Sequence, residues 1–221
     1  MEGSSARRYR DGARAVAPLA FAVLGFGISF GLLARSAGMG WLAPIVMSAT
    51  TFAGSAQFAA VSILGAGGTV AAAVAAAVLL NLRYGPIGVS VAPWLDGPAW
   101  WRLLRAQLVV DESWALAAEG EGRFDPGILV GAGLLLYLSW VAGTAIGALG
   151  GQALGDPKTL GLDAAFPALF LALLLLQLRN RRTIVAAVLG GAIALALTPV
   201  APAGVPIIAA SAACLIGLAR K

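Results

Sequence analysis

The chain has 221 residues, of which 60% are hydrophobic and only 11% are charged, with a formal net charge of +5. Soluble domains carry about 25% charged residues, so this composition excludes an ordinary soluble globular protein. Long apolar runs and a mean hydropathy of +0.89 predict an all-α, polytopic integral membrane protein, because a helix needs about 20 apolar residues to cross a bilayer. A transmembrane barrel is not expected, since its strands alternate in shorter segments.

The basic residues lie beside apolar runs rather than in a domain of their own, so they indicate membrane orientation and not nucleic-acid binding. Histidine is absent and Cys214 is the single cysteine, which excludes histidine catalysis, histidine metal ligands and an internal disulfide. Neither a metal nor a cofactor is expected. Any proton chemistry falls to a carboxyl group or to a tuned lysine or tyrosine.

Residues 1–16 are predicted to form a basic cytoplasmic segment, and residues 17–221 a single transmembrane domain. The first apolar run is long for a signal-peptide core and lacks a convincing cleavage site, so we interpret it as a retained span. Seven to eight spans are expected, some short or broken, with a possible inverted repeat. The eight candidate segments are 17–34, 41–65, 69–94, 99–120, 127–149, 161–178, 183–199 and 203–219.

The second segment contains FAGSAQF, residues 52–58, which brings a glycine, a serine and a glutamine into an apolar run. Glycine followed by serine lets the backbone leave helix geometry, and unwound backbone in a membrane lines a cavity or is buried in protein. One interpretation is a broken helix whose second half begins near Ser55, as in transporters that bind a carboxylate at such a break. The alternative is a straight helix in which Gly54 and Ser55 allow close packing and Gln57 bonds to a neighbour.

The third segment carries Asn81 and Arg83 near its middle, followed by Tyr84, Gly85 and Pro86. A guanidinium stays charged and must find an anion or reach the interface, and the proline disrupts the helix beside it. Arg83 is therefore expected at an interruption, where it contacts a substrate carboxylate or pairs with an acidic residue of the fourth segment. A shorter span, with Arg83 in the interface, is the alternative.

The fourth segment, AWWRLLRAQLVVDESWALAAEG, is either a crossing helix or a solvated amphipathic helix in a loop. Only the crossing version keeps most arginines of the later loops on the cytoplasmic side, so we predict that it crosses. Asp111 and Glu112 then lie near mid-membrane and point about 100° apart, so that one of them can bind an ammonium group or a proton. A structural ion pair between Arg105 and Glu112 is the alternative.

Two features around the fifth segment have structural interpretations. Asp125 and Pro126 form a favourable helix start, with aspartate as the cap and proline in the first position. Gly143, Gly147 and Gly151 recur every four residues, which permits close helix contact within the chain or with a partner. Neither feature requires a binding function.

The motifs FAGSAQF, NLRYG, VVDESWAL and LDAAFPALFLALL follow one another along the chain. In this order they resemble the AzlC-type branched-chain amino acid permeases, the large subunits of AzlC/AzlD exporters, over nearly the whole chain. The resemblance implies proton-motive export of valine, leucine, isoleucine and sometimes methionine across a bacterial inner membrane. It also implies a small AzlD-type membrane subunit as partner. Family members often carry a histidine where this chain has Tyr84, so a histidine-dependent step is not expected here.

Together these features predict a secondary transporter for an amino-acid zwitterion, not an enzyme, because membrane serine proteases use a histidine that this chain lacks. A non-transporting subunit of a membrane complex, or an exporter of another small zwitterion, is the alternative. Both termini are expected in the cytoplasm, and the oligomeric state is open. The expected substrate-binding residues are Phe52, Gly54, Ser55, Gln57, Asn81 and Arg83, and the expected ammonium-binding or proton-coupling residues are Asp111 and Glu112.

Overall fold

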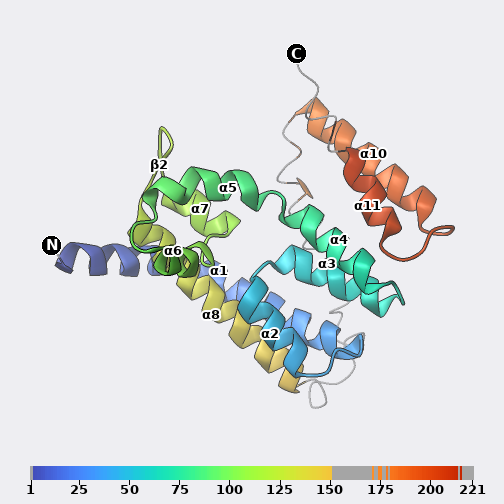
Figure 1. Ribbon diagram of the computed structural model, residues 1–221, viewed down its shortest axis with the longest axis horizontal. Helices are drawn as coiled ribbons and strands as arrows, with labels where there is room; N and C mark the ends of the chain where they lie inside the picture. The colour runs from blue at the N-terminus through green and yellow to red at the C-terminus, as the bar shows by residue number, and fades with distance from the viewer. Residues whose placement is uncertain are drawn as a thin grey trace.

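The computed structural model describes residues 2–150 and 180–213, together with positions 171, 174, 175, 178 and 215. These residues are mostly helical, with one small antiparallel hairpin (Figure 1). The expected span 161–178 lies almost wholly outside the described residues, and so does Gly151. In chain order the elements are α1 (Glu2–Ser36), α2 (Leu42–Thr51), α3 (Gly54–Gly65), α4 (Val70–Asn81), α5 (Tyr84–Val91), η1 (Ala92–Trp94), α6 (Ala99–Ala106), α7 (Asp111–Ala117), β1 (Ala118–Gly120), β2 (Arg123–Phe124), α8 (Pro126–Gly150), α10 (Arg181–Leu197) and α11 (Val205–Ser211).

The long helices α1 and α8 lie side by side and run in the same direction (Figure 1). Near their starts, a Cβ added to Gly12 would collide with Ile128. Near their ends, a Cβ added to Gly31 would collide with the backbone at Ala148. Glycine therefore allows the two backbones to touch along the pair, and the contact predicted for the fifth segment is made within the chain, against α1. Both helices are long and apolar enough to cross a membrane.

The start of α8 is capped as the sequence predicts. Asp125 Oδ1 accepts hydrogen bonds from the backbone N–H groups of Gly127, at 2.8 Å, and Ile128, at 3.0 Å. The other carboxylate oxygen pairs with Arg8, which also lies 3.7 Å from Glu119. The basic N-terminal segment is thus part of α1 and packs against the loop that leads into α8.

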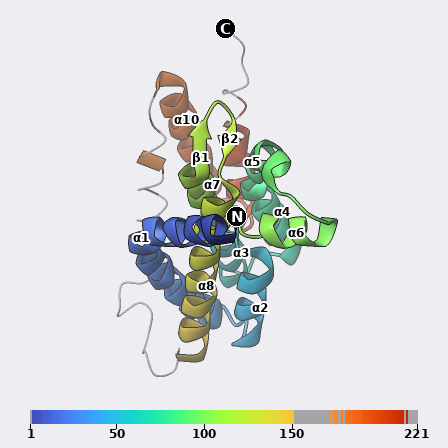
Figure 2. The ribbon, with the colours of Figure 1, turned by 90° about the vertical axis from the view of Figure 1, so that its left-hand side faces the viewer.

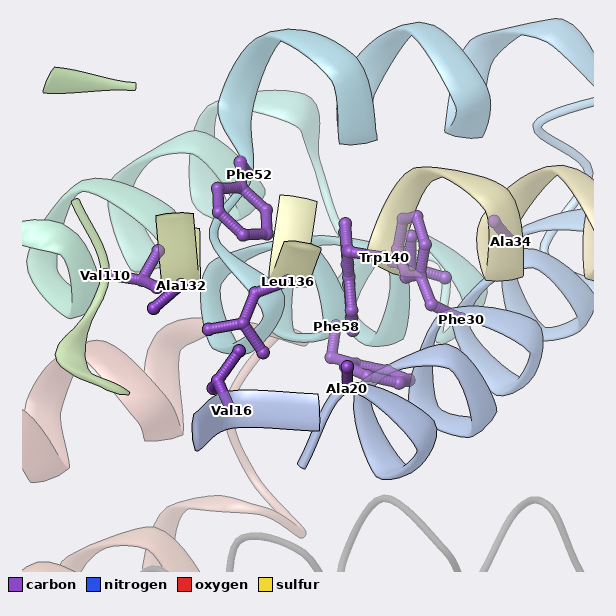
Figure 3. Close-up of a cluster of buried hydrophobic side chains, with 11 residues drawn as sticks. Val16, Ala20, Phe30, Ala34, Phe52, Phe58, Val110, Ala132, Leu136 and Trp140 are labelled. Carbon is purple, nitrogen blue, oxygen red and sulfur yellow. The ribbon is translucent and has the colours of Figure 1, made fainter. Parts of the chain in front are cut away.

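A buried apolar cluster joins α1, α3 and α8 (Figure 3). The ring of Phe30 lies 5.5 Å from Phe58, edge to face, and 5.8 Å from Trp140, stacked. Phe58 and Trp140 also meet edge to face at 6.0 Å. Because aromatic rings bury large areas and fix one another's orientation, this cluster holds α3 against the two long helices.

Helices α2 and α3 form a hairpin whose tip reaches the middle of α8. α2 begins just after α1 ends, and the chain turns at Phe52, whose ring lies 5.2 Å from Tyr137 near the centre of α8. α3 then runs back, and Gly65 at its end packs against Ala37, directly after α1. Both ends of the hairpin therefore lie at the C-terminal end of α1, and the segment 41–65 does not form the single crossing helix that was expected.

Helices α4 and α5 follow one bent path along the long helices. α4 packs against α3, and α4 and the α5–η1 helix are bent by 44° at the break around Arg83, which confirms the interruption predicted there. Pro86 falls in the first turn of α5, where its missing N–H is not needed. At the far end Leu95 packs with Phe124 and Leu129, at the start of α8. Taken as one span, residues 70–94 are long and apolar enough to cross, in agreement with the expected third segment.

The expected crossing helix over 99–120 is not formed. The segment instead contains α6, an extended turn at Val110, α7 and strand β1. Two adjacent valines favour extended backbone, and Asp111 and Glu112 favour the first turn of a helix, where α7 begins. Ser113 closes the turn by accepting from the Val110 N–H at 3.0 Å and donating to the Leu108 carbonyl at 2.9 Å.

The described residues contain two helices that can span a membrane, or three when the bent pair is counted as one span. The expected count of eight is therefore not confirmed. α6, the β1–β2 hairpin and the N-terminus lie toward one end of the molecule (Figure 1 and Figure 2). α10 and α11 pack against each other; α10 begins two residues before the expected segment 183–199, and α11 lies within the expected segment 203–219. The turn before α11 contacts α4 where Gly204 meets Ala72.

Candidate functional site

Of the two interpretations of FAGSAQF, the structure has the broken helix rather than the straight one. α2 ends at Thr51, Phe52 adopts a left-handed conformation with φ of 41°, and α3 begins at Gly54. A non-glycine residue in this conformation is uncommon and marks a tight local constraint. Gly54 is needed for packing rather than for backbone freedom, because a Cβ there would lie 3.1 Å from the Trp140 ring.

Gln57 is fully buried in a polar network between α2, α3 and α8. Its Oε1 accepts from Trp140 Nε1 at 3.0 Å and from the Ala53 N–H at 3.2 Å, so its amide holds the break together. Its Nε2 donates to Ser48 Oγ at 2.9 Å. The Thr144 hydroxyl donates to the Trp140 carbonyl, so it accepts from Ser48 at 2.8 Å. Each hydrogen bond from Gln57 through Ser48 to Thr144 therefore has a defined donor and acceptor. The structure therefore shows the alternative in which Gln57 bonds to neighbours, away from the expected substrate site.

Replacing Gln57 by leucine should lower the thermal unfolding midpoint of the purified protein in detergent by roughly 5 °C or more. Leucine has a similar size but leaves the N–H groups of Ala53 and Trp140 buried without an acceptor, at about 1–3 kcal/mol each. Gln107→Leu makes the same change at a half-buried side chain and should shift the midpoint far less. Equal midpoints for Gln57→Leu and the unaltered protein would contradict this role.

The tip of the α2–α3 hairpin meets the segment between α6 and α7 at the middle of the fold. Gln107, between α6 and α7, donates from Nε2 to the Thr50 carbonyl at 2.9 Å, at the end of α2. Tyr137 of α8 donates to the neighbouring Ala49 carbonyl at 2.8 Å. These side chains supply the donors that the interrupted α2 can no longer provide to its last carbonyls. Gln107 was not among the predicted site residues. Its amide side chain interrupts the apolar run LLRAQLVV, just as that of Gln57 interrupts its own segment, and this could have indicated a role in hydrogen bonding.

Arg83, between α4 and α5, connects the starts of α3 and α7 beside the tip of the α2–α3 hairpin. Its Nη2 lies 3.0 Å from Asp111 Oδ2, at the start of α7, and donates to Ser55 Oγ at 3.1 Å, at the start of α3. The guanidinium also lies 5.2 Å from the ring centroid of Tyr84. The prediction that Arg83 pairs with an acidic residue of the fourth segment is confirmed for Asp111. The Arg83 and Asp111 side chains are 42% and 44% exposed, so the pair is accessible rather than sealed in the core.

Glu112 lies next to this cluster without forming an ion pair in it. It is exposed in the first turn of α7, and the ion pairs found among the described residues do not include it. The alternative ion pair with Arg105 is not formed, because α6 and α7 are separate helices. Arg105 instead donates to the Asp96 carbonyl at 2.9 Å and lies 6.0 Å from the Trp101 ring.

A pocket of about 540 Å³ opens between the α2–α3 tip, α5 and α6. Phe52 and Asn81, both expected at the substrate site, line it, and so does Tyr84, whose hydroxyl reaches Arg83. The buried side-chain oxygen of Asn81 has no hydrogen-bond partner in the described part of the chain. The pocket and the Arg83–Asp111 pair are therefore neighbours that share Tyr84, rather than one continuous cavity.

The structure divides the predicted site residues into three groups. Ser55, Arg83 and Asp111 meet in one cluster, and Phe52 and Asn81 line the adjacent pocket. The others lie apart: Gly54 and Gln57 pack on Trp140, and Glu112 faces outward.

The chain matches known membrane proteins along most of its length. A family model described as AzlC protein matches residues 18–154. A membrane protein of Archaeoglobus fulgidus, described as uncharacterized, is 33% identical over 215 residues, covering 95% of this chain and 94% of that protein. The branched-chain amino acid transport protein AzlC of Bacillus subtilis is 31% identical over 163 residues, which cover 72% of this chain and 64% of that protein.

The inner membrane protein YgaZ of Escherichia coli is 26% identical over 196 residues, or 84% of this chain and 80% of that protein. No solved structure matches the chain. These similarities place the chain among membrane proteins, and one of the relatives is named for branched-chain amino acid transport.

Proposed function

Because the chain belongs to the AzlC family, we propose that it exports branched-chain amino acids across the inner membrane as a secondary transporter driven by the proton motive force. Valine, leucine and isoleucine are the proposed substrates, with methionine as a further one. The observation that carries the proposal is the accessible Arg83–Asp111 pair beside two broken helices and a pocket at the middle of the fold.

Broken helices at this level suit an amino-acid carboxylate. The first N–H groups of α3, beginning at Gly54, have no carbonyl of a preceding turn to bond, and the helix dipole gives this end a partial positive charge. Arg83 and the Ser55 hydroxyl lie beside it. An anion placed here gains a guanidinium, a hydroxyl and a helix N-terminus together, which is the kind of site that discontinuous helices supply in other transporters.

The Arg83–Asp111 pair has the same two charges as an amino-acid zwitterion. Unpaired charges at mid-membrane are costly, so in the empty carrier each group neutralises the other. A zwitterion can take over both contacts, with its carboxylate on Arg83 and its ammonium group on Asp111. Each charge then keeps a partner throughout, and the exchange requires little net free energy. In this proposal Asp111, or Glu112 after it in α7, carries the coupling proton when no ammonium group is bound.

The remaining parts of the proposal rest on the family resemblance and on the distribution of charge. A small AzlD-type membrane subunit completes the carrier, and both termini lie in the cytoplasm. The basic N-terminal segment supports this orientation, since positive charge is retained on the cytoplasmic side.

Proteoliposomes loaded with labelled leucine should release it when an inward proton gradient is imposed, and release should require the small subunit. With leucine at equal concentration inside and outside, dissipating the gradient with an ionophore should reduce net efflux at least tenfold, because the proton gradient is then the only driving force. Liposomes containing the small subunit alone are the control. Folded protein that releases no leucine, valine, isoleucine or methionine under any of these conditions would overturn the proposed function.

A further inference from the structure

The lining of the pocket beside the α2–α3 tip changes in polarity along the length of the pocket. At one end it contains Asn81 and Tyr84, next to the guanidinium of Arg83. Further along α5 its walls are mostly apolar, with Ile87 of α5 and Leu103 of α6. Arg102 and Gln107 also line the pocket, and the Arg102 guanidinium donates to the Ala92 carbonyl at 3.5 Å. Mostly apolar walls with a few polar groups match a small ligand that has a polar head and a hydrocarbon tail.

Space is left open along one face of α5. Tyr84, Gly88 and Ala92 follow one another at intervals of four residues, so they share a face of the helical path, and all three line the pocket. A Cβ added to Gly88 would meet no atom within 4 Å. The free space therefore lies one helical turn, about 5.4 Å, beyond the polar end of the pocket.

We propose that this pocket is the subsite for the side chain of the transported amino acid, and that Gly88 sets the largest side chain it accepts. The inference rests on the proposed function, since the polar head of the substrate is the group placed at Arg83 and Asp111. The tail then extends from Tyr84 along α5 toward Ala92. Small residues at positions 88 and 92 leave room for branched aliphatic side chains.

Gly88→Leu should change selectivity without disturbing the fold, because the added side chain enters open space. One methylene in an apolar pocket is worth 10–200-fold in specificity. The ratio of leucine to valine efflux, compared as kcat/KM, should therefore fall about tenfold. Gly85→Leu is the matched control, since Gly85 lies in the same helix, does not line the pocket and also has nothing within 4 Å of an added Cβ. Its ratio should stay within twofold of the unaltered protein, and an unchanged ratio in Gly88→Leu would overturn the subsite.

A labelling experiment separates this inference from the proposed transport. With Cys214 replaced by serine, Gly88→Cys provides a single thiol for N-ethylmaleimide. Saturating leucine should slow its modification at least fivefold, glycine should not, and Gly85→Cys should be modified equally with or without leucine. Protection without leucine efflux would retain the subsite and overturn the export proposal. Leucine efflux without protection at position 88 would overturn the subsite and leave the export proposal standing.

Discussion

Asp111→Asn should abolish amino-acid efflux, by at least 100-fold, while leaving the protein folded in membranes. Asparagine preserves the shape of the side chain but removes its charge, so Arg83 loses the anion that lies 3.0 Å away. A guanidinium does not deprotonate, and it would then hold a substrate carboxylate without releasing it or draw another anion into the site. The ammonium group of the substrate also loses its partner. Initial efflux rates, normalised to the amount of folded protein, measure the effect.

Two further variants separate transport from structural support. Asp96→Asn makes the same change in the exposed loop before α6 and should keep efflux within about twofold of the unaltered protein. The exchange of Arg83→Asp with Asp111→Arg restores an ion pair but moves the positive charge away from Ser55 and the start of α3. We expect this double variant to be folded, like Asp111→Asn, but not to recover efflux. Full activity in Asp111→Asn, or in the charge exchange, would show that the pair has a structural role only.

Gly147→Leu should prevent assembly of the α1–α8 pair and reduce the yield of monodisperse protein at least tenfold. A Cβ at this position would collide with the backbone carbonyl of Ile28, and backbone cannot move aside as the end of a flexible side chain can. The two helices must therefore separate along their length, which removes the contacts that small residues provide between helices in a membrane. Size-exclusion profiles of detergent-extracted protein report the yield.

Gly25→Leu is the matched control for this interface. It makes the same substitution in α1, at an exposed position where an added Cβ meets nothing within 4 Å. Its yield should equal that of the unaltered protein. A normal yield for Gly147→Leu would show that α1 and α8 do not pack through their glycines.

The local breaks could be predicted from the sequence because each has a chemical signature in a short stretch of residues. Glycine and serine beside Gln57 were consistent with a break or with a straight helix, and the structure has the break at Phe52. Pro86 beside Arg83 indicated the bend between α4 and α5. The need to neutralise a permanent positive charge likewise predicted that Arg83 pairs with Asp111 or Glu112. The sequence did not show which of Asp111 and Glu112 pairs with Arg83. That depends on where α7 begins, which residue spacing within one assumed long helix cannot give.

Long-range partners could not be predicted in the same way. Nothing near Gln57 indicates that Trp140 donates to it or that Ser48 links it to Thr144, since Trp140 and Thr144 are far away in the chain and are brought close only by the packing of α8. The prediction that segment 99–120 forms one crossing helix was wrong, because hydropathy measures how well a segment dissolves in lipid and not whether it crosses the membrane. Two short helices with an extended turn at Val110 have the same composition as one long helix.

The parallel arrangement of α1 and α8 has a consequence for how the chain threads the membrane. Two helices that enter from the same face require an odd number of crossings between them. The bent path α4–α5 provides one, and the α2–α3 hairpin returns to the end from which it started. Segment 41–65 returns and segment 99–120 forms no crossing helix, so together they leave every later loop on the same face as two crossings would. Arg102 and Arg105 then lie on the face of the basic N-terminus, and the bias of positive charge toward that face is stronger than in the arrangement where both segments cross.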